Sequence, residues 1–342
     1  RSSDLVDFQL PWMEERSRLR VGLQPFTVNE YLWKETAGAI NFYGSGGVLD
    51  YELAWARGHE IELTQNSTED DEHEDVDAYL ARLNFDPAED MKAGVFLLFQ
   101  NNDAGSGSGV ITPQGYIVKS LNNVDFDLWT IGIDGSYDMD GFFFNWDLMY
   151  QDGEMKDATF AGRTDDFDLS AWFGHADLGL KMGNHKITYT FWYASGDDDA
   201  DDDEFDAFLA TDLDRADSIA IMEGGYVDDD YFTERPYILD KGMIFNKLAL
   251  DSKVTDKLTL GAAAIYMMTA EDLEYTDNLG REQSDDKIGF ELDAYMSYML
   301  TPTWNLQSMP AIFGLMTQWI SSRSEISARS EEHTSELQSL LI

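Results

Sequence analysis

Residues 127–151, DLWTIGIDGSYDMDGFFFNWDLMYQ, decide the fold class of this chain. Between Trp129 and Tyr137, large apolar side chains take every second position, and small or polar ones lie between them. A turn at residues 138–141 reverses the chain, and residues 142–151 alternate in the same way. Successive side chains of a strand point to opposite faces, so this pattern predicts a hairpin with one aromatic, apolar face and one polar face. Each strand has roughly ten residues, the length that a tilted strand needs to cross a bilayer.

Composition narrows the class of protein. The 342 residues include 66 acidic and 23 basic side chains, for a formal charge of −43. This balance argues against nucleic acid as a partner, because phosphate binding relies on Lys and Arg. It fits divalent cations, a salty medium or plain solubility. The absence of cysteine excludes disulfides and thiolate metal sites. The sequence has no apolar run of about 18 residues, but transmembrane strands escape that test because only alternate residues face lipid.

The hairpin pattern recurs along the chain and predicts about thirteen strands. They are residues 18–24, 39–43, 49–57, 77–85, 91–100, 127–137, 142–151, 168–182, 186–195, 243–254, 258–268, 287–300 and 304–315. Every second connection is only a few residues long, and six others are predicted as long loops. The long loops are residues 25–38, 59–75, 101–124, 152–166, 196–241 and 270–286. Outer-membrane barrels have this alternation, with short turns on the periplasmic side and long loops outside.

The predicted fold is therefore all-β: a transmembrane, antiparallel, up-and-down β-barrel with about 14–18 strands in the complete protein and long acidic extracellular loops. Residues 17–320 form the predicted barrel channel domain, and residues 1–16 are unassigned. Residues 321–342 are interpreted as a non-native or disordered tail, because residues 329–339, RSEEHTSELQS, resemble a translated sequencing adapter. The chain is accordingly expected to be a fragment. The alternative fold is a soluble all-β protein, in which the aromatic side chains fill a core.

The apolar faces of the strands are expected to meet lipid and the opposite faces to line the lumen. Side chains of both signs occupy the second set, as is usual for an aqueous channel. The predicted pore-lining residues are Arg18, Arg20, Glu52, Arg82, Lys92, Asp134, Asn145, Asp147, Asp177, Lys181, Lys186, Glu291 and Asp293. Lys181 and Lys186 oppose each other across a minimal turn, which predicts that both point into water near the periplasmic rim.

An acidic run in the longest predicted loop is the candidate cation site. Asp197, Asp199, Asp201 and Asp203 supply the hard oxygen ligands that Ca²⁺ prefers, but the run lacks the Gly of an EF-hand loop. The hypothesis is weak Ca²⁺ binding on an extracellular loop, and the alternative is a solvated acidic loop. The sequence contains no H-E-x-x-H pair and no G-x-S-x-G elbow, and its carboxylates single out no acid/base couple. No enzymatic activity is predicted.

Three short motifs resemble one family. Residues 18–26 (RLRVGLQPF), 189–199 (YTFWYASGDDD) and 257–262 (KLTLGA) are similar to segments of the alginate-export-type porins of Gram-negative outer membranes. The similarity extends over about residues 17–306. It implies a monomeric barrel of about sixteen to eighteen strands that conducts small solutes or a polyanionic sugar.

The sequence thus predicts a bacterial outer-membrane porin for passive diffusion of small hydrophilic solutes or ions. Acidic residues in the outer loops should concentrate cations at the mouth and give a weak cation preference. Expected partners are outer-membrane lipid, lipopolysaccharide and the permeating solutes, with the chain a monomer or a trimer. The alternatives are a polysaccharide export channel of the alginate type and, from another class, a soluble Ca²⁺-binding all-β surface protein or carbohydrate-active enzyme.

Overall fold

The computed structural model describes most of the chain up to residue 307. The described residues are 5–10, 17–57, 76–102, 109–111, 117, 121, 124–199, 201–211, 237, 240–276, 280–301 and 304–307. They contain strands β1 (Leu5–Gln9), β2 (Ser17–Asn29), β3 (Trp33–Ser45), β4 (Leu49–Arg57), β5 (Asp77–Ala88), β6 (Met91–Asn102), β7 (Asp125–Met139), β8 (Phe142–Phe160), β9 (Arg163–Met182), β10 (His185–Ala194), β11 (Glu204–Phe205), β12 (Met243–Lys253), β13 (Leu258–Thr276), β14 (Glu282–Thr301) and β15 (Trp304–Gln307). Among these residues, no helix is long and apolar enough to cross a bilayer.

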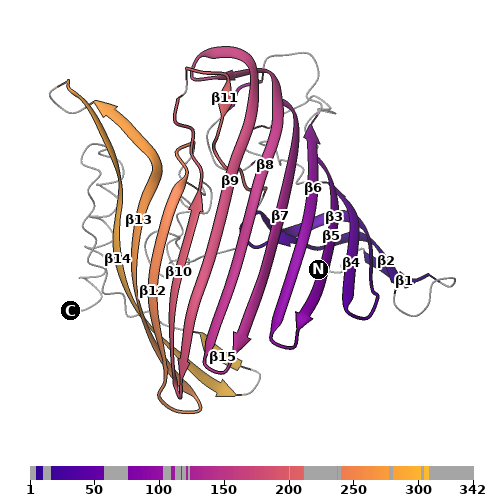
Figure 1. Ribbon diagram of the computed structural model, residues 1–342, viewed down its shortest axis with the longest axis vertical. Helices are drawn as coiled ribbons and strands as arrows, with labels where there is room; N and C mark the ends of the chain where they lie inside the picture. The colour runs from indigo at the N-terminus through magenta and orange to yellow at the C-terminus, as the bar shows by residue number, and fades with distance from the viewer. Residues whose placement is uncertain are drawn as a thin grey trace.

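The strands form one up-and-down sheet. From β1 to β15 each strand pairs antiparallel with the next one along the chain, except that β11 leaves this path and pairs parallel with β9. The sheet curves around internal segments (Figure 1), and we call it the wall. Within the described residues, β1 and β15 end the order of pairing and do not pair with each other. The prediction of an all-β, antiparallel, up-and-down fold is confirmed.

The short connections gather at one end of the wall, the lower end in Figure 1. The hairpin of β7 and β8 shows their construction, because the two strands are joined by Asp140 and Gly141 alone. Their φ angles are 20° and 93°. Two-residue hairpin turns favour positive φ at both positions because the resulting twist matches that of the strands, and Gly tolerates it without strain.

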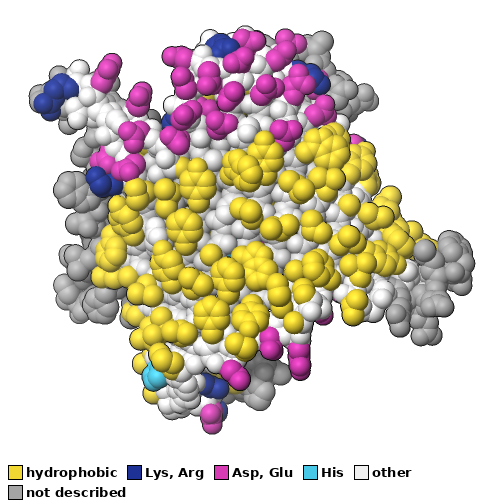
Figure 2. Space-filling model, viewed as in Figure 1, with side chains coloured by type: hydrophobic (Ala, Val, Ile, Leu, Met, Phe, Trp, Pro, Cys, Tyr) yellow, Lys and Arg dark blue, Asp and Glu magenta, His cyan; other side chains and the backbone are white. Residues whose placement is uncertain are grey.

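The outer face of the wall is apolar, as the alternation predicts. On β7, Trp129, Ile131 and Ile133 are 46%, 51% and 47% exposed, whereas the neighbouring Leu128 and Thr130 are 1% and 0% exposed. The same alternation places Leu83, Leu97, Leu148, Leu178, Leu248, Leu260, Leu292 and Met296 on the outside of their strands. Figure 2 shows hydrophobic side chains gathered in a belt across the wall. Water-soluble monomers rarely expose an apolar surface of this extent, so the belt is the lipid-facing surface of a membrane protein.

Aromatic side chains mark both margins of the belt. At the upper margin, Phe99 packs against Trp129 with ring centroids 4.5 Å apart, and Tyr150 packs against Trp172 at 4.4 Å. Towards the lower end, Phe144 stacks on Trp146 at 5.2 Å. Aromatic rings with an apolar body and a polar edge favour the interface between hydrocarbon and water, so these rows resemble the girdles of outer-membrane barrels.

Three of the predicted long loops are wrong, and two of them are the upper ends of wall strands. Residues 152–166 continue β8 and β9, which are joined by Ala161 and Gly162, and most of residues 270–286 belongs to β13 and β14. These strand ends rise above the belt, where carboxylates cover the surface in Figure 2. Their outward side chains are therefore polar, while inward ones such as Met155 and Phe167 stay buried. The density of Asp and Glu concealed the alternation in the sequence.

The beginning of the chain also differs from the prediction. Residues 5–9, for which no element was predicted, form β1, which pairs antiparallel with β2. Asp7 of β1 also binds Arg18 and Arg20 of β2, at 2.8 and 3.1 Å. Residues 25–38 are mostly strand rather than loop. They form the ends of β2 and β3, which extend away from the wall as a pair. The adapter-like segment and the tail at 321–342 lie outside the described residues.

Candidate functional site: the interior of the wall

The predicted pore-lining residues share one face. All thirteen alternate along their strands with outward-facing belt residues, so the structure places them on the inner face of the wall. Water contact along a passage stays a prediction for each of them. Arg18 and Arg20 bind Asp7 near the start of the wall, and Glu52 accepts a hydrogen bond from Asn41 at 2.5 Å. Glu291 and Asp293 lie on β14, at the far end of the order of strands.

The two predicted lysines near the periplasmic rim oppose each other in the strand register. Lys181 on β9 pairs with Lys186 on β10. Their ammonium nitrogens lie 5.4 and 4.6 Å from the centre of the Phe143 ring, and Lys181 also binds Asp138. The aromatic ring and one carboxylate thus offset part of the repulsion between the two charges. Lys92 also lies on the inner face, opposite Ser136.

A two-stranded arm reaches from the wall into the interior. The last wall pairings of β2 and β3 are Gly22 with Leu5 of β1 and Gly38 with Arg57 of β4. Between these glycines, β2 and β3 pair only with each other among the described residues, and residues 30–32 join them. We call residues 23–37 the arm. In Figure 1 it crosses behind β5–β7.

Polar contacts fix the tip of the arm to the inner wall. Arg82 on β5 donates from Nη1 to the Val28 carbonyl at 2.9 Å and binds Asp134 on β7 through Nη2 at 2.7 Å. Asn29 donates from Nδ2 to Asp147 on β8 at 2.6 Å. Arg82, Asp134 and Asp147, three predicted pore-lining residues from three strands, therefore meet at the arm.

His175 on β9 organises the next contacts and was missed in the sequence analysis. Its Nδ1 lies 2.6 Å from Asp147, and its Nε2 lies 3.4 Å from Asp177. Asp177 also accepts hydrogen bonds from Thr190 at 2.6 Å and Asn145 at 3.3 Å. The register of β8 and β9 places His175 directly opposite Asp147. Sequence spacing among histidines gave no sign of this cluster, but the predicted pairing of the two strands could have revealed it.

A second internal piece, residues 206–211, packs beside the arm. We call it the inward segment. The side chain of Gln151 on β8 binds both backbone groups of Leu209. Its Nε2 donates to the Leu209 carbonyl at 2.8 Å, and its Oε1 accepts from the Leu209 N–H at 3.0 Å. Gln100 of β6 binds the Thr211 hydroxyl at 3.1 Å. The Thr211 N–H donates to the Leu32 carbonyl at 2.7 Å and so connects the inward segment to the arm.

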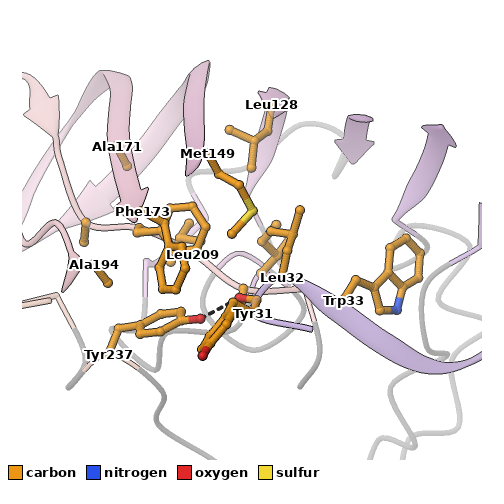
Figure 3. Packing of buried hydrophobic residues seen from close by; sticks show 14 of the residues in the cluster. Tyr31, Leu32, Trp33, Leu128, Met149, Ala171, Phe173, Ala194, Leu209 and Tyr237 are labelled. Carbon is orange, nitrogen blue, oxygen red and sulfur yellow. Dashed lines mark hydrogen bonds between the residues drawn. The ribbon is translucent and has the colours of Figure 1, made fainter. Parts of the chain in front are cut away.

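Aromatic packing completes the interior. Figure 3 shows Tyr31 and Leu32 of the arm lying against Phe173, Leu209 and Tyr237, with a hydrogen bond from the Tyr237 hydroxyl to the Tyr31 carbonyl at 2.5 Å. The Tyr31 ring lies 4.8 Å from Phe173. Burying side chains of this size stabilises a structure by about 1.5–3 kcal/mol each, so the arm and the inward segment form a packed plug against the wall.

Gln151→Ala is expected to loosen the inward segment. The substitution leaves two buried backbone groups of Leu209 without their partners, and each loss costs about 1–3 kcal/mol. Limited proteolysis of the folded protein should cleave the variant faster near residues 206–211 than the parent chain. Ser136→Ala, on the inner face of β7, serves as a control and should leave the cleavage rate unchanged. Equal rates in Gln151→Ala and the parent chain would contradict this anchoring.

The acidic run does not gather around one point. In the described part of the chain, no group of three His, Cys, Asp or Glu side chains is placed to hold a metal ion. Asp199 accepts from the Asp201 N–H at 3.0 Å, and Arg163 donates to the carbonyls of Asp201 and Asp202. Asp197 is buried instead of exposed, and this burial raises its pKa to about 6. Calcium binding at Asp197, Asp199, Asp201 and Asp203 stays a prediction, which calorimetry of the intact protein at about millimolar Ca²⁺ tests.

Comparisons with known proteins give distant structural similarities. No protein-family model matches the chain, and no curated protein matches it in sequence. Among solved structures, OccK3 (OpdO) of Pseudomonas aeruginosa is 14% identical with a TM-score of 0.47, over 85% of this chain and 69% of OccK3. OccK9 (OpdG) of the same organism is 12% identical with a TM-score of 0.48, over 86% of this chain and 65% of OccK9. OccK10 (OpdN) of the same organism is 12% identical with a TM-score of 0.46, over 86% of this chain and 71% of OccK10.

Proposed function

We propose that this chain forms an outer-membrane porin, an aqueous channel for passive diffusion of small hydrophilic solutes or ions without covalent chemistry. The observation that carries the proposal is the division of the wall into two faces: an apolar belt outside, and arginine, lysine and carboxylate side chains inside. In lipid every backbone group must be paired, which an antiparallel sheet achieves when it closes into a barrel. A soluble all-β protein or carbohydrate-active enzyme would instead bury its largest apolar face.

The proposed membrane environment follows from the same surface. The belt lies between aromatic rows, and the carboxylate-covered strand ends of β8 and β9 rise above it. This polarity supports an orientation with the acidic end outside the cell, next to lipopolysaccharide, and the short turns in the periplasm. The excess of carboxylates should concentrate cations near the mouth, which supports a weak cation preference. Export of an alginate-like polysaccharide is proposed only from the motifs that resemble that family.

Swelling of proteoliposomes tests the proposed channel. The intact chain is folded into phospholipid vesicles, insertion is confirmed by resistance of the wall to protease, and the vesicles are diluted into isosmotic solutions of uncharged sugars of increasing size. A porin should give swelling that slows as the sugar becomes larger. Vesicles that carry the inserted protein but swell in no sugar, as empty vesicles do, would overturn the proposal.

A further inference from the structure

The arm differs from an ordinary connecting loop because it is built as a rigid, paired element. Its two strands pair antiparallel along their whole length. The first pair is Leu23 with Gly38, and the last is Asn29 with Trp33. It bends away from the wall at Gly22, whose φ of 120° lies in a region that L side chains rarely adopt. Gly22 pairs with Ala39, next to Gly38, so both strands turn at the same level.

The inner face of the wall has room for the Arg82 side chain, which binds the arm. Gly94 on β6 leaves open the space that Arg82, Asp134 and Asn84 occupy. A Cβ at Gly94 would lie 2.5 Å from Asp134 Oδ1, 2.7 Å from Arg82 Nη2 and 2.8 Å from Asn84 Oδ1. The guanidinium can therefore bind Asp134 and Asn84 and still reach the Val28 carbonyl. Arg82 is a positioning residue, which acts by holding the arm at one depth.

The two faces of the arm have different environments. Phe26, Val28 and Trp33 are buried, and the rings of Phe26 and Trp33 meet edge to face at 4.7 Å. On the opposite face Thr27 and Thr36 are exposed, together with Leu23 and Pro25, and Lys34 pairs with Thr27 on the same face. Because the arm lies inside the wall and its buried face is packed, the exposed face with Thr27 and Thr36 is the one available to solutes within the channel.

We infer that the arm is the constriction element of the channel, and that its Thr27 and Thr36 face borders the passage and sets the size limit for hydrophilic solutes. The inference rests on the proposed porin function. It adds that a two-stranded element bent inward at Gly22, rather than a flexible loop, narrows the passage, and that Arg82 and Asp147 hold this element in place. Removal of the arm should therefore widen the channel without removing the wall.

An arm-less variant tests this directly. Residues 24–37 are replaced by Asn-Gly, which closes the Leu23–Gly38 pair with a two-residue hairpin turn. Unit conductance in a planar bilayer should rise, and the size limit in vesicle swelling should shift to larger sugars. An inserted arm-less variant with the conductance and size limit of the parent chain would overturn the inference. Failure of the parent chain itself to conduct would instead count against the porin proposal.

Cysteine modification tests the same point without removing buried side chains. The chain has no cysteine, so Thr27→Cys creates a single reactive thiol on the exposed face of the arm. A bulky, uncharged methanethiosulfonate reagent should lower the unit conductance of this variant by narrowing the passage. Asp152→Cys, exposed on the outer face of β8, is the matched control and should conduct as before after modification. Complete labelling of Thr27→Cys, shown by mass spectrometry, with unchanged conductance would contradict the assignment.

Discussion

Ile133→Arg is expected to destabilise the membrane-inserted protein by about 2–4 kcal/mol, the cost of an arginine on the lipid face at the middle of a bilayer. Ile133 lies on β7 midway between Trp129, at the upper margin of the belt, and Tyr137, and it is 47% exposed on the outer face. Its cross-strand partners Val95 and Leu148 are apolar, so the guanidinium gains no carboxylate there.

The stability change is measured by unfolding the protein from phospholipid vesicles with denaturant. Ser136→Arg is the matched control, because Ser136 lies three residues further along β7 on the inner face, opposite Lys92 and Asn145. Its effect should be much smaller than that of Ile133→Arg. Equal effects of the two substitutions would mean that the belt does not meet lipid.

Gly132→Ala is expected to destabilise the wall by about 1–3 kcal/mol through overpacking. Gly132 faces inward on β7, and the ring of Phe96 from β6 lies directly over it, so that an added Cβ would overlap Phe96 Cε1 and Cζ and lie 3.0 Å from Met149 Cγ. Phe96 is fully buried and has little room to move aside. The same arrangement recurs where the ring of Phe143 lies over Gly179 and that of Tyr295 lies over Gly261.

Gly174→Ala separates this packing effect from a general cost of replacing a strand glycine. An added Cβ at Gly174 meets only Leu148 Cδ1, at 3.7 Å, which is an ordinary contact. Denaturant unfolding from vesicles should therefore show a clear loss for Gly132→Ala and little change, or a small gain, for Gly174→Ala. A Gly132→Ala variant as stable as the parent chain would show that Phe96 is free to leave its place over the glycine.

The features of the fold that are encoded locally could be predicted from the sequence. Alternation along β7 and β8 predicted both the outward position of Ile131 and the inward position of Asp147, because the period of two depends only on backbone geometry. The short turn at Asp140 and Gly141 could also be predicted, because it depends only on residues next to each other in the sequence. Above the belt the outward side chains change from apolar to acidic, and the ends of β8 and β9 were therefore misread as a loop.

The interior could not be predicted in the same way. Asn29 and Asp147 are 118 residues apart in the sequence, and Tyr31 and Tyr237 are 206 apart. Their contacts depend on the inward bend at Gly22, and a single glycine in a strand pattern does not reveal its direction. His175 appeared isolated in the sequence because its partners Asp147 and Asp177 are identified only by the strand register.

Single-channel recording in a planar bilayer with a KCl gradient tests the central claim most directly. The intact chain should produce discrete, stable steps of current. The reversal potential should have the sign of a weak cation preference, and this preference should fall as ionic strength rises, because salt screens the carboxylates at the mouth. Folded, membrane-inserted protein that gives no steps at any potential would contradict the account of the wall as an aqueous channel.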